Sequence, residues 1–152
     1  MGDSHAAALY TGIRKKTSKI TQLTGAGCPP LLNHGGFEPR KECAEANTFA
    51  SEFVRDKKPG TIFLHAVWNE HDETQMLNSL DHTLRYIKTV SPDSKVFLIG
   101  PVPQWKPTLP DYALRKHVSL TRETYLKMPM YQKLRALDIK IQRLSMENKI
   151  TY

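Results

Sequence analysis

Two short and almost uninterrupted apolar runs constrain the fold of this chain more than any other feature. They are Thr61–Val67 (TIFLHAV) and Lys95–Ile99 (KVFLI), and a helix-like stretch precedes each of them. Apolar residues at nearly every position are typical of a strand that is buried on both faces of a parallel sheet. Strands that alternate with amphipathic helices indicate an α/β fold.

The remaining segments fit this alternation. Apolar residues at helical spacing predict helices over Ser4–Lys16, Lys41–Lys57, Asp72–Val90 and Met130–Asn148, with a shorter one near Asp111–His117. Further strand candidates are Lys19–Thr24 and Lys149–Tyr152, and Gly25–Arg40 is a predicted loop. Because crossovers between parallel strands are right-handed, we predict one flavodoxin-like α/β/α sandwich over residues 1–152, with a mostly parallel sheet.

The chain opens with Met1-Gly2-Asp3-Ser4-His5-Ala6, directly before the first predicted helix. This order places the Ser4 hydroxyl at a helix N-terminus, where unpaired N–H groups and the helix dipole favour negative charge. A nucleophilic serine needs such donors, because its acyl-transfer intermediate carries an oxyanion. The alternative is that Asp3 or Ser4 only caps the helix, and three residues alone favour that interpretation.

Charge and composition exclude several classes of protein. The 152 residues include 22 basic and 15 acidic ones, a formal net charge of +7. The basic residues are scattered and do not alternate with aromatic ones, so we expect a solvated surface and no nucleic-acid partner. No apolar run approaches the roughly 20 residues that span a bilayer, and no signal peptide is visible.

The chain has 2 cysteines, Cys28 and Cys43, which flank a loop rich in proline and glycine. Their spacing fits neither a metal site nor a CxxC redox motif. A disulfide that closes such a loop would contribute about 3 kcal/mol and would imply an oxidising compartment. Two buried free thiols are the alternative, and the spacing favours neither.

Gly2–Ala6 resembles block I of the SGNH (GDSL-like) hydrolases. The closest resemblance is to the SGNH domains fused to membrane acyltransferase-3 proteins, which O-acylate cell-surface polysaccharide. Further matching segments follow in the order of that subgroup over essentially the whole chain: Ile20–Thr24, Gly27–Pro30, Cys43, Leu64–Trp68 and Val96–Pro103.

This resemblance implies that Ser4 is the nucleophile. It implies that the N–H of Ser4 and that of a glycine after the second strand contribute to the oxyanion hole. Gly25 and Gly27 are the candidates, and the alternative is that both only serve loop geometry. Asp3 and His5, which flank Ser4, are expected to support the site. The resemblance also favours a disulfide between the cysteines.

The third oxyanion donor of the family is an asparagine in a Gly-x-Asn-Asp block. Here the corresponding residues are Val67-Trp68-Asn69-Glu70, without the glycine. Asn69 is therefore a candidate donor, Trp68 can take its place, and the alternative is that Asn69 caps the following helix. The departure matters, because loss of one oxyanion donor typically lowers turnover by about 10²–10³.

The family completes its site with an Asp-x-x-His pair near the C-terminus, and no aspartate here has a histidine three residues later. His5 is expected to point elsewhere, His65 to lie in the core and His34 in the loop; His71, His82 and His117 are expected at the surface. We expect the missing pair beyond Tyr152 and a strand before Gly2, as in a domain trimmed at both ends. Such a piece should be nearly inactive and express poorly alone.

The predicted function is that of a serine esterase or O-acyltransferase acting on acyl, usually acetyl, esters of cell-surface glycans. No metal or organic cofactor is implied. The expected partners are a glycan or acyl-ester substrate and a membrane acyltransferase domain, which would place this domain in the periplasm or elsewhere outside the cytoplasm.

Two alternatives come from other classes of protein. Asp3-x-His5 also begins the metal site of metallophosphoesterases, but the Gly-Asp and Gly-Asn-His blocks of that family are absent. An inactive carbohydrate-binding module could use Trp68, Trp105 and Tyr112 to stack on sugars, although aromatic residues more often fill a core.

Overall fold

The sheet is parallel and has the predicted strand order. The computed structural model describes residues 1–32, 41–105, 108–117, 119 and 121–152. Strand β1 (Thr61–Leu64) pairs in parallel with β2 (Lys95–Leu98), with Thr61 opposite Lys95. Parallel bridges continue the sheet on both sides: Gly2 pairs with His65 and Thr24, and Phe97 pairs with Thr151. The five chain segments thus lie in the flavodoxin order 2-1-3-4-5, as the sequence predicted.

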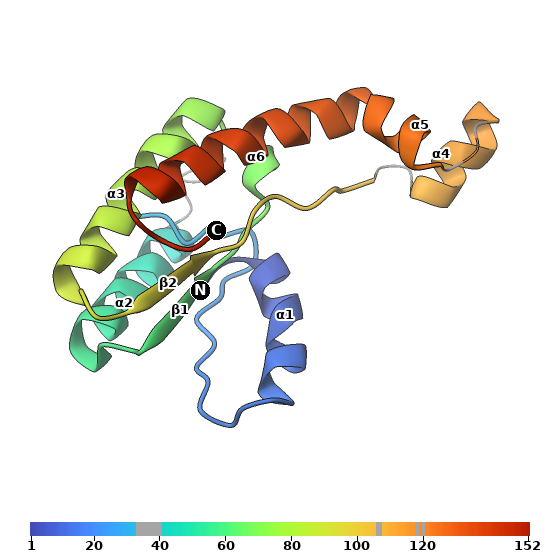
Figure 1. Cartoon of the computed structure of the whole chain (residues 1–152). Helices are drawn as coiled ribbons and strands as arrows, with labels where there is room; N and C mark the ends of the chain where they lie inside the picture. Colours follow the sequence, from blue (N-terminus) through green and yellow to red (C-terminus); the bar gives the residue numbers. More distant parts are fainter. Residues whose placement is uncertain (33–40, 106–107, 118, 120) are drawn as a thin grey trace.

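All the predicted helices are present to within a few residues, and the described residues add two that were not predicted. The helices are α1 (Ser4–Arg14), α2 (Lys41–Lys57), η1 (Trp68–Glu70), α3 (Glu73–Val90), α4 (Leu109–Lys116), α5 (Arg122–Lys127) and α6 (Pro129–Glu147), and the two additions are η1 and α5. Helices α2, α3 and α6 pack side by side in that order, while α1 lies beside the Gly2 end of the sheet (Figure 1).

The described residues place the main core on one face of β1 and β2. Ile62 and Leu64 are buried against residues of α3 and α6, whereas Phe63 is 38% exposed and stacks on Phe97. The prediction that the Thr61–Val67 run is buried on both faces is therefore wrong over β1. The reason is that the buried cluster formed with α3 and α6 lies on the Ile62 side, so alternate residues of the strand point away from it.

The predicted strand over Lys19–Thr24 is also wrong, because Thr24 alone forms a bridge there. The Gly2 amide donates to the Leu23 carbonyl at 3.1 Å, and the Gly25 amide donates to the Gly2 carbonyl at 3.1 Å. Residues 19–22 have no such partner among the described residues, and without a ladder an apolar alternation does not make a strand. Residues 33–40 of the predicted loop lie outside the described residues.

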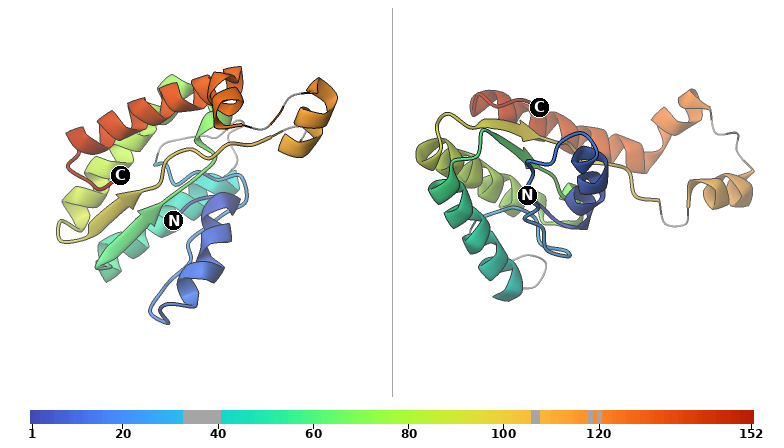
Figure 2. Two further views of the ribbon diagram at one scale, coloured as in Figure 1. Left: turned by 45° about the vertical axis from the view of Figure 1, so that its right-hand side comes forward. Right: turned by 90° about the horizontal axis from the view of Figure 1, so that it is seen from below.

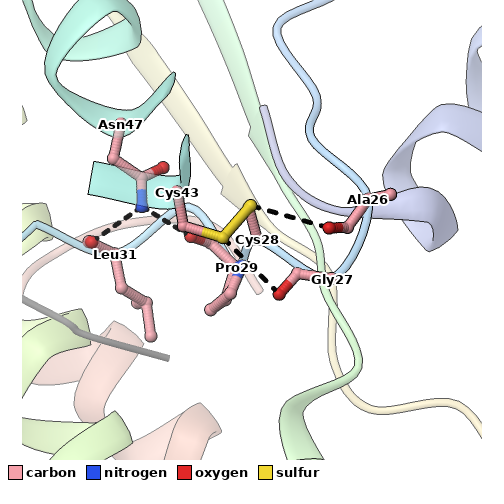
Figure 3. Close-up of a disulfide and its surroundings, with 7 residues drawn as sticks. All are labelled: Ala26, Gly27, Cys28, Pro29, Leu31, Cys43 and Asn47. Carbon is pink, nitrogen blue, oxygen red and sulfur yellow. Dashed lines mark hydrogen bonds between the residues drawn. A yellow bond between two sulfur atoms is a disulfide. The ribbon is translucent and has the colours of Figure 1, made fainter. Parts of the chain in front are cut away.

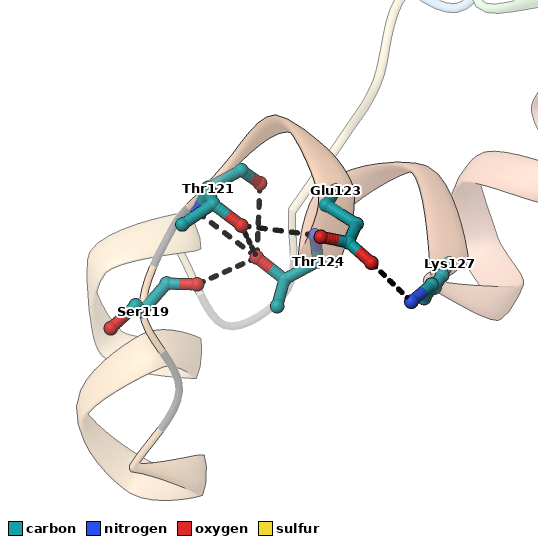
Figure 4. Close-up of polar contacts among 5 residues, drawn as sticks. All are labelled: Ser119, Thr121, Glu123, Thr124 and Lys127. Carbon is teal, nitrogen blue, oxygen red and sulfur yellow. Dashed lines mark hydrogen bonds and ion pairs between the residues drawn. The ribbon is translucent and has the colours of Figure 1, made fainter.

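A short helix that the sequence did not predict, α5, begins in the proline-rich segment. Thr121 and Thr124 form a capping box: the Thr124 amide donates to Thr121 Oγ1 at 3.2 Å, and the Thr121 amide donates to Thr124 Oγ1 at 3.0 Å (Figure 4). Lys127 and Glu123 add an exposed ion pair of 2.6 Å. The box satisfies the amide of Thr124 in the first turn and that of the N-cap residue Thr121.

Helices α4 and α5, with the described residues that join them to β2 and α6, project from the body of the molecule (Figures 1 and 2). We call the described residues of the range 105–131, which ends in the first turn of α6, the arm. Neither α4 nor α5 contains a buried residue, and no described residue of the arm belongs to the main core cluster. None of the helices within the described residues combines the length and apolar character that crossing a membrane requires.

Cys28 and Cys43 form a disulfide that joins the loop after Gly25 to the first turn of α2 (Figure 3). Their Cα atoms are 5.1 Å apart, and both cysteines are buried. The Asn47 side chain donates to the carbonyls of Pro29 and Leu31, at 2.9 and 3.0 Å. The disulfide and these hydrogen bonds together fix the loop on α2.

Candidate functional site

The Ser4 hydroxyl lies at the corner where the sheet meets α1. Gly2 forms a parallel bridge with Thr24 on one side and with His65 on the other, Asp3 is the N-cap, and the helix begins at Ser4 itself. Ser4 is exposed, and neither its hydroxyl nor its amide forms a hydrogen bond with any described residue. An open hydroxyl beside an unpaired amide at a helix N-terminus is the arrangement that a developing negative charge requires.

Asp3 fixes this corner to the chain that follows β1. Asp3 is 2% exposed; one oxygen of its carboxylate accepts from the His5 amide and the other from the Val67 amide, both at 2.8 Å. Two charge-assisted hydrogen bonds hold the turn from inside the protein. They also occupy the oxygens that a metallophosphoesterase would offer to its metal. Across the described ranges, no three His, Cys, Asp or Glu side chains are grouped to hold a metal ion.

The His5 ring forms its hydrogen bond with Gln104 and not with Ser4. Its Nε2 forms a hydrogen bond of 2.9 Å with the side-chain nitrogen of Gln104. Its Nδ1 lies 3.7 Å from the Asp3 carboxylate. The sequence did not single out Gln104. Its position just beyond a parallel strand, at the edge where ligands bind in such sheets, was the only signal that could have found it.

His65 is a core histidine, as predicted. It is 4% exposed, its Nδ1 lies 3.3 Å from the Ile99 carbonyl, and its ring meets the His5 ring edge-on at 6.1 Å. Burial lowers the pKa of His65, opposed by the Ile99 carbonyl and the Asp3 carboxylate. The side chain is therefore neutral near pH 7.

Trp68 is fully buried, and its Nε1 donates to the Ile99 carbonyl at 2.8 Å. It cannot stack on a sugar, so that part of the carbohydrate-module alternative is wrong. Asn69, the next residue, is exposed in η1. The interpretation of Asn69 as a helix cap is also wrong, because Val67 precedes η1 and Asp72 caps α3.

Asn69 borders a cleft of about 540 Å³ between η1 and the first turns of α6. Met130, Leu134 and Leu137 supply apolar walls, and Glu73 and Lys133 supply charged ones. The candidate third donor thus faces a space large enough for part of a substrate.

The two candidate glycines differ in what their amides do. The Gly25 amide donates to the Gly2 carbonyl at 3.1 Å and is therefore used by the fold. The Gly27 amide is bonded to no described residue, and Gly27 has φ +66°, a conformation that glycine adopts without strain. Of the two, Gly27 has the available N–H.

The other histidines do not compete for the role of base. His82 and His117 are exposed, His71 is half-buried, and His34 lies outside the described residues. Within the described part of the chain, no histidine forms a hydrogen bond with Ser4.

Comparison with known proteins identifies the family and the fold. A family model described as the SGNH domain (fused to AT3 domains) matches residues 1–152, and the chain therefore belongs to this family. The fold is similar to that of the periplasmic domain of a lipopolysaccharide acetyltransferase from Salmonella ser. Paratyphi A, with a TM-score of 0.73 and 24% sequence identity. The similarity covers 99% of this chain and 62% of that one. No match was found among curated proteins.

Proposed function

We propose that this domain transfers acyl groups through Ser4, and that its substrate is an acyl ester, in the first instance an acetyl ester, of a cell-surface glycan. The observation that carries the proposal is the open Ser4 hydroxyl and amide on a turn that Asp3 holds in place. Membership of the SGNH family and the similarity in fold to an acetyltransferase domain support it.

In the proposed mechanism, Ser4 Oγ attacks the acyl carbonyl carbon and its proton passes to a base. The carbonyl π electrons move onto oxygen, and the amides of Ser4 and Gly27 donate to that oxyanion, with Asn69 as a third donor. Collapse expels the alcohol, which takes the proton, and leaves an acyl-serine. Water or a sugar hydroxyl then attacks this ester and releases Ser4. The first acceptor gives hydrolysis and the second gives transfer.

The Asp-x-x-His pair that would supply the base in this family is not in the sequence. A serine hydroxyl without a base is a poor nucleophile near neutral pH. We therefore expect the 152 residues alone to turn over slowly, and we expect added imidazole to replace the missing proton acceptor in part.

The proposed setting is outside the cytoplasm, next to a membrane acyltransferase domain. The family is one whose SGNH domains are fused to AT3 domains, and the similar Salmonella domain is periplasmic. The buried Cys28–Cys43 disulfide supports this setting, because such bonds persist in oxidising compartments.

Reaction with a fluorophosphonate, followed by peptide mass spectrometry, tests the proposal. We expect one adduct, on Ser4, that forms at least about tenfold faster with imidazole and is absent from Ser4→Ala. Ser18, an exposed serine outside any helix, is the internal control, and Ser18→Ala should react like the parent. Equal modification of Ser4 and Ser18, or no effect of imidazole, would overturn the proposal.

A further inference from the structure

Four aromatic rings form one continuous cluster on the arm. The Trp105 ring lies 6.1 Å from that of Tyr112 and 5.8 Å from that of Tyr125, centroid to centroid, and Tyr125 lies 4.6 Å from Tyr131. The rings are tilted by 48° to 55°. They come from the segment after β2, from α4, from α5 and from the first turn of α6, so the cluster joins every part of the arm.

The cluster is not part of the main core. None of the four residues belongs to the buried group around β1, β2, α3 and α6, and each ring is partly exposed. Trp68 shows the contrast, since it is fully buried and bonded through its nitrogen. The rings on the arm hold one another in place and still present surface to solvent.

The polar edge of the cluster is also available. Within the described residues, the hydroxyls of Tyr112, Tyr125 and Tyr131 form no hydrogen bond, and neither does the indole nitrogen of Trp105. Fixed apolar faces edged by free hydroxyls and an N–H match the surface of a sugar ring, which has an apolar C–H face and a rim of hydroxyls.

The cluster begins next to the proposed catalytic corner. Trp105 directly follows Gln104, whose side chain is bonded to His5, and His5 directly follows Ser4. A chain molecule held on the arm could therefore extend from the Trp105 end of the cluster towards Ser4. A polymer is the substrate for which such an extended surface is useful.

We propose that Trp105, Tyr112, Tyr125 and Tyr131 form a carbohydrate-binding surface that holds the glycan substrate. The link to catalysis rests on the proposed function, whereas sugar binding by the arm does not. Ser4→Ala should therefore bind sugar as the parent does. If sugar binds but the fluorophosphonate does not label Ser4, only the proposed function is contradicted. If Ser4 is labelled but no sugar binds, only the proposed role of the arm is contradicted.

The test is ¹⁹F NMR on the domain labelled with 5-fluorotryptophan, which gives one signal for Trp105 and one for buried Trp68. The signals are assigned with Trp105→Phe. The probes are maltohexaose, chitohexaose and the O-polysaccharide released from lipopolysaccharide by mild acid. We expect at least one probe to shift the Trp105 signal saturably and to leave that of Trp68 unchanged.

Variants show whether the whole cluster binds. Tyr112→Ala and Tyr131→Ala should each weaken binding at least about tenfold. Tyr112→Phe should weaken it about threefold, because it removes only the hydroxyl. This variant keeps the ring and therefore tests the proposal even if the alanine variant disorders the arm. Leu114→Ala is the matched control, because Leu114 is on α4 and 73% exposed, and its affinity should not change. The proposal would be overturned if no probe shifted the Trp105 signal, or if only the Trp68 signal shifted. It would also be overturned if the tyrosine variants kept the affinity of the parent. Loss of binding in moderate salt would overturn it too, because it would mean that charges and not the rings hold the sugar.

Discussion

Asp3 bears most directly on the geometry of Ser4, because both of its oxygens accept backbone amides from inside the protein. Asp3→Asn replaces one acceptor by an N–H₂ group that faces a donor. We expect this change to lower the free energy of unfolding by about 2–3 kcal/mol, measured by urea denaturation.

Asp72→Asn is the matched control for this prediction. Asp72 is an exposed cap that accepts one amide, from Gln75 at 2.8 Å, and asparagine caps helices about as well as aspartate. It should change stability by less than about 0.5 kcal/mol. Equal effects of the two substitutions would show that Asp3 is an ordinary cap and does not hold the corner.

Gly2 lies between the backbones of Thr24 and His65, where a side chain would not fit. It has φ +150°, and a Cβ there would lie 1.8 Å from the His65 carbonyl oxygen. Gly2→Ala should therefore cost more than about 2 kcal/mol. Gly12→Ala, inside α1 with open space around it, should raise stability by about 0.5–1 kcal/mol. Thermal unfolding of both variants measures the difference, and a stable Gly2→Ala would contradict this backbone geometry.

His65 makes stability depend on pH. Burial holds its folded pKa below 6.5, so the unfolded chain binds this proton first as the pH falls. The contribution of His65 to stability is present above pH 6.5 and is lost as the pH falls below it, by at most about 1.4 kcal/mol per pH unit.

Urea denaturation between pH 7 and pH 5 measures this slope. His65→Gln should make it shallower, and His82→Gln, at an exposed position, should leave it unchanged. If His65→Gln retains the slope of the parent, another group is responsible for it.

At the scale of elements, the disulfide decides how firmly the loop with Gly27 is held on α2. It joins cysteines 15 residues apart, and a loop of that size gives about 3 kcal/mol by restricting the unfolded chain. Cys28→Ala/Cys43→Ala should lose about that much stability. A reducing agent should lower the melting temperature of the parent to that of the double variant and should not change the variant itself. A parent unaffected by reductant would contradict the bond.

The elements that sequence predicted well are those whose pattern reflects burial. Helix α2 has the predicted bounds, since Cys43, Ala50 and Val54 face the interior at helical spacing. The strand predicted at Lys19–Thr24 failed because pairing depends on a neighbouring backbone that sequence does not reveal. Helix α5 was missed because two threonine side chains define its start, and a short helix has too little periodicity to detect.

At the scale of the molecule, the order of the sheet follows from alternation and crossover handedness, and the sequence therefore predicted it. The sequence also indicated Ser4, because Gly-Asp-Ser lies before a helical pattern. It could not separate Gly25 from Gly27, since the difference is whether the amide is used in pairing with Gly2. Nor could it join Gln104 to His5, because that contact spans 99 positions and depends on the fold.

The ¹H–¹⁵N NMR spectrum of the domain before and after phosphonylation of Ser4 tests the central claim most directly. The phosphonyl oxygen stands in for the oxyanion, so the amide signals of Ser4 and Gly27 should move downfield. The Gly25 amide, which is bonded to the Gly2 carbonyl, should stay in place. Movement of Gly25 without Gly27, or no movement of Ser4 and Gly27, would contradict an oxyanion site at this corner.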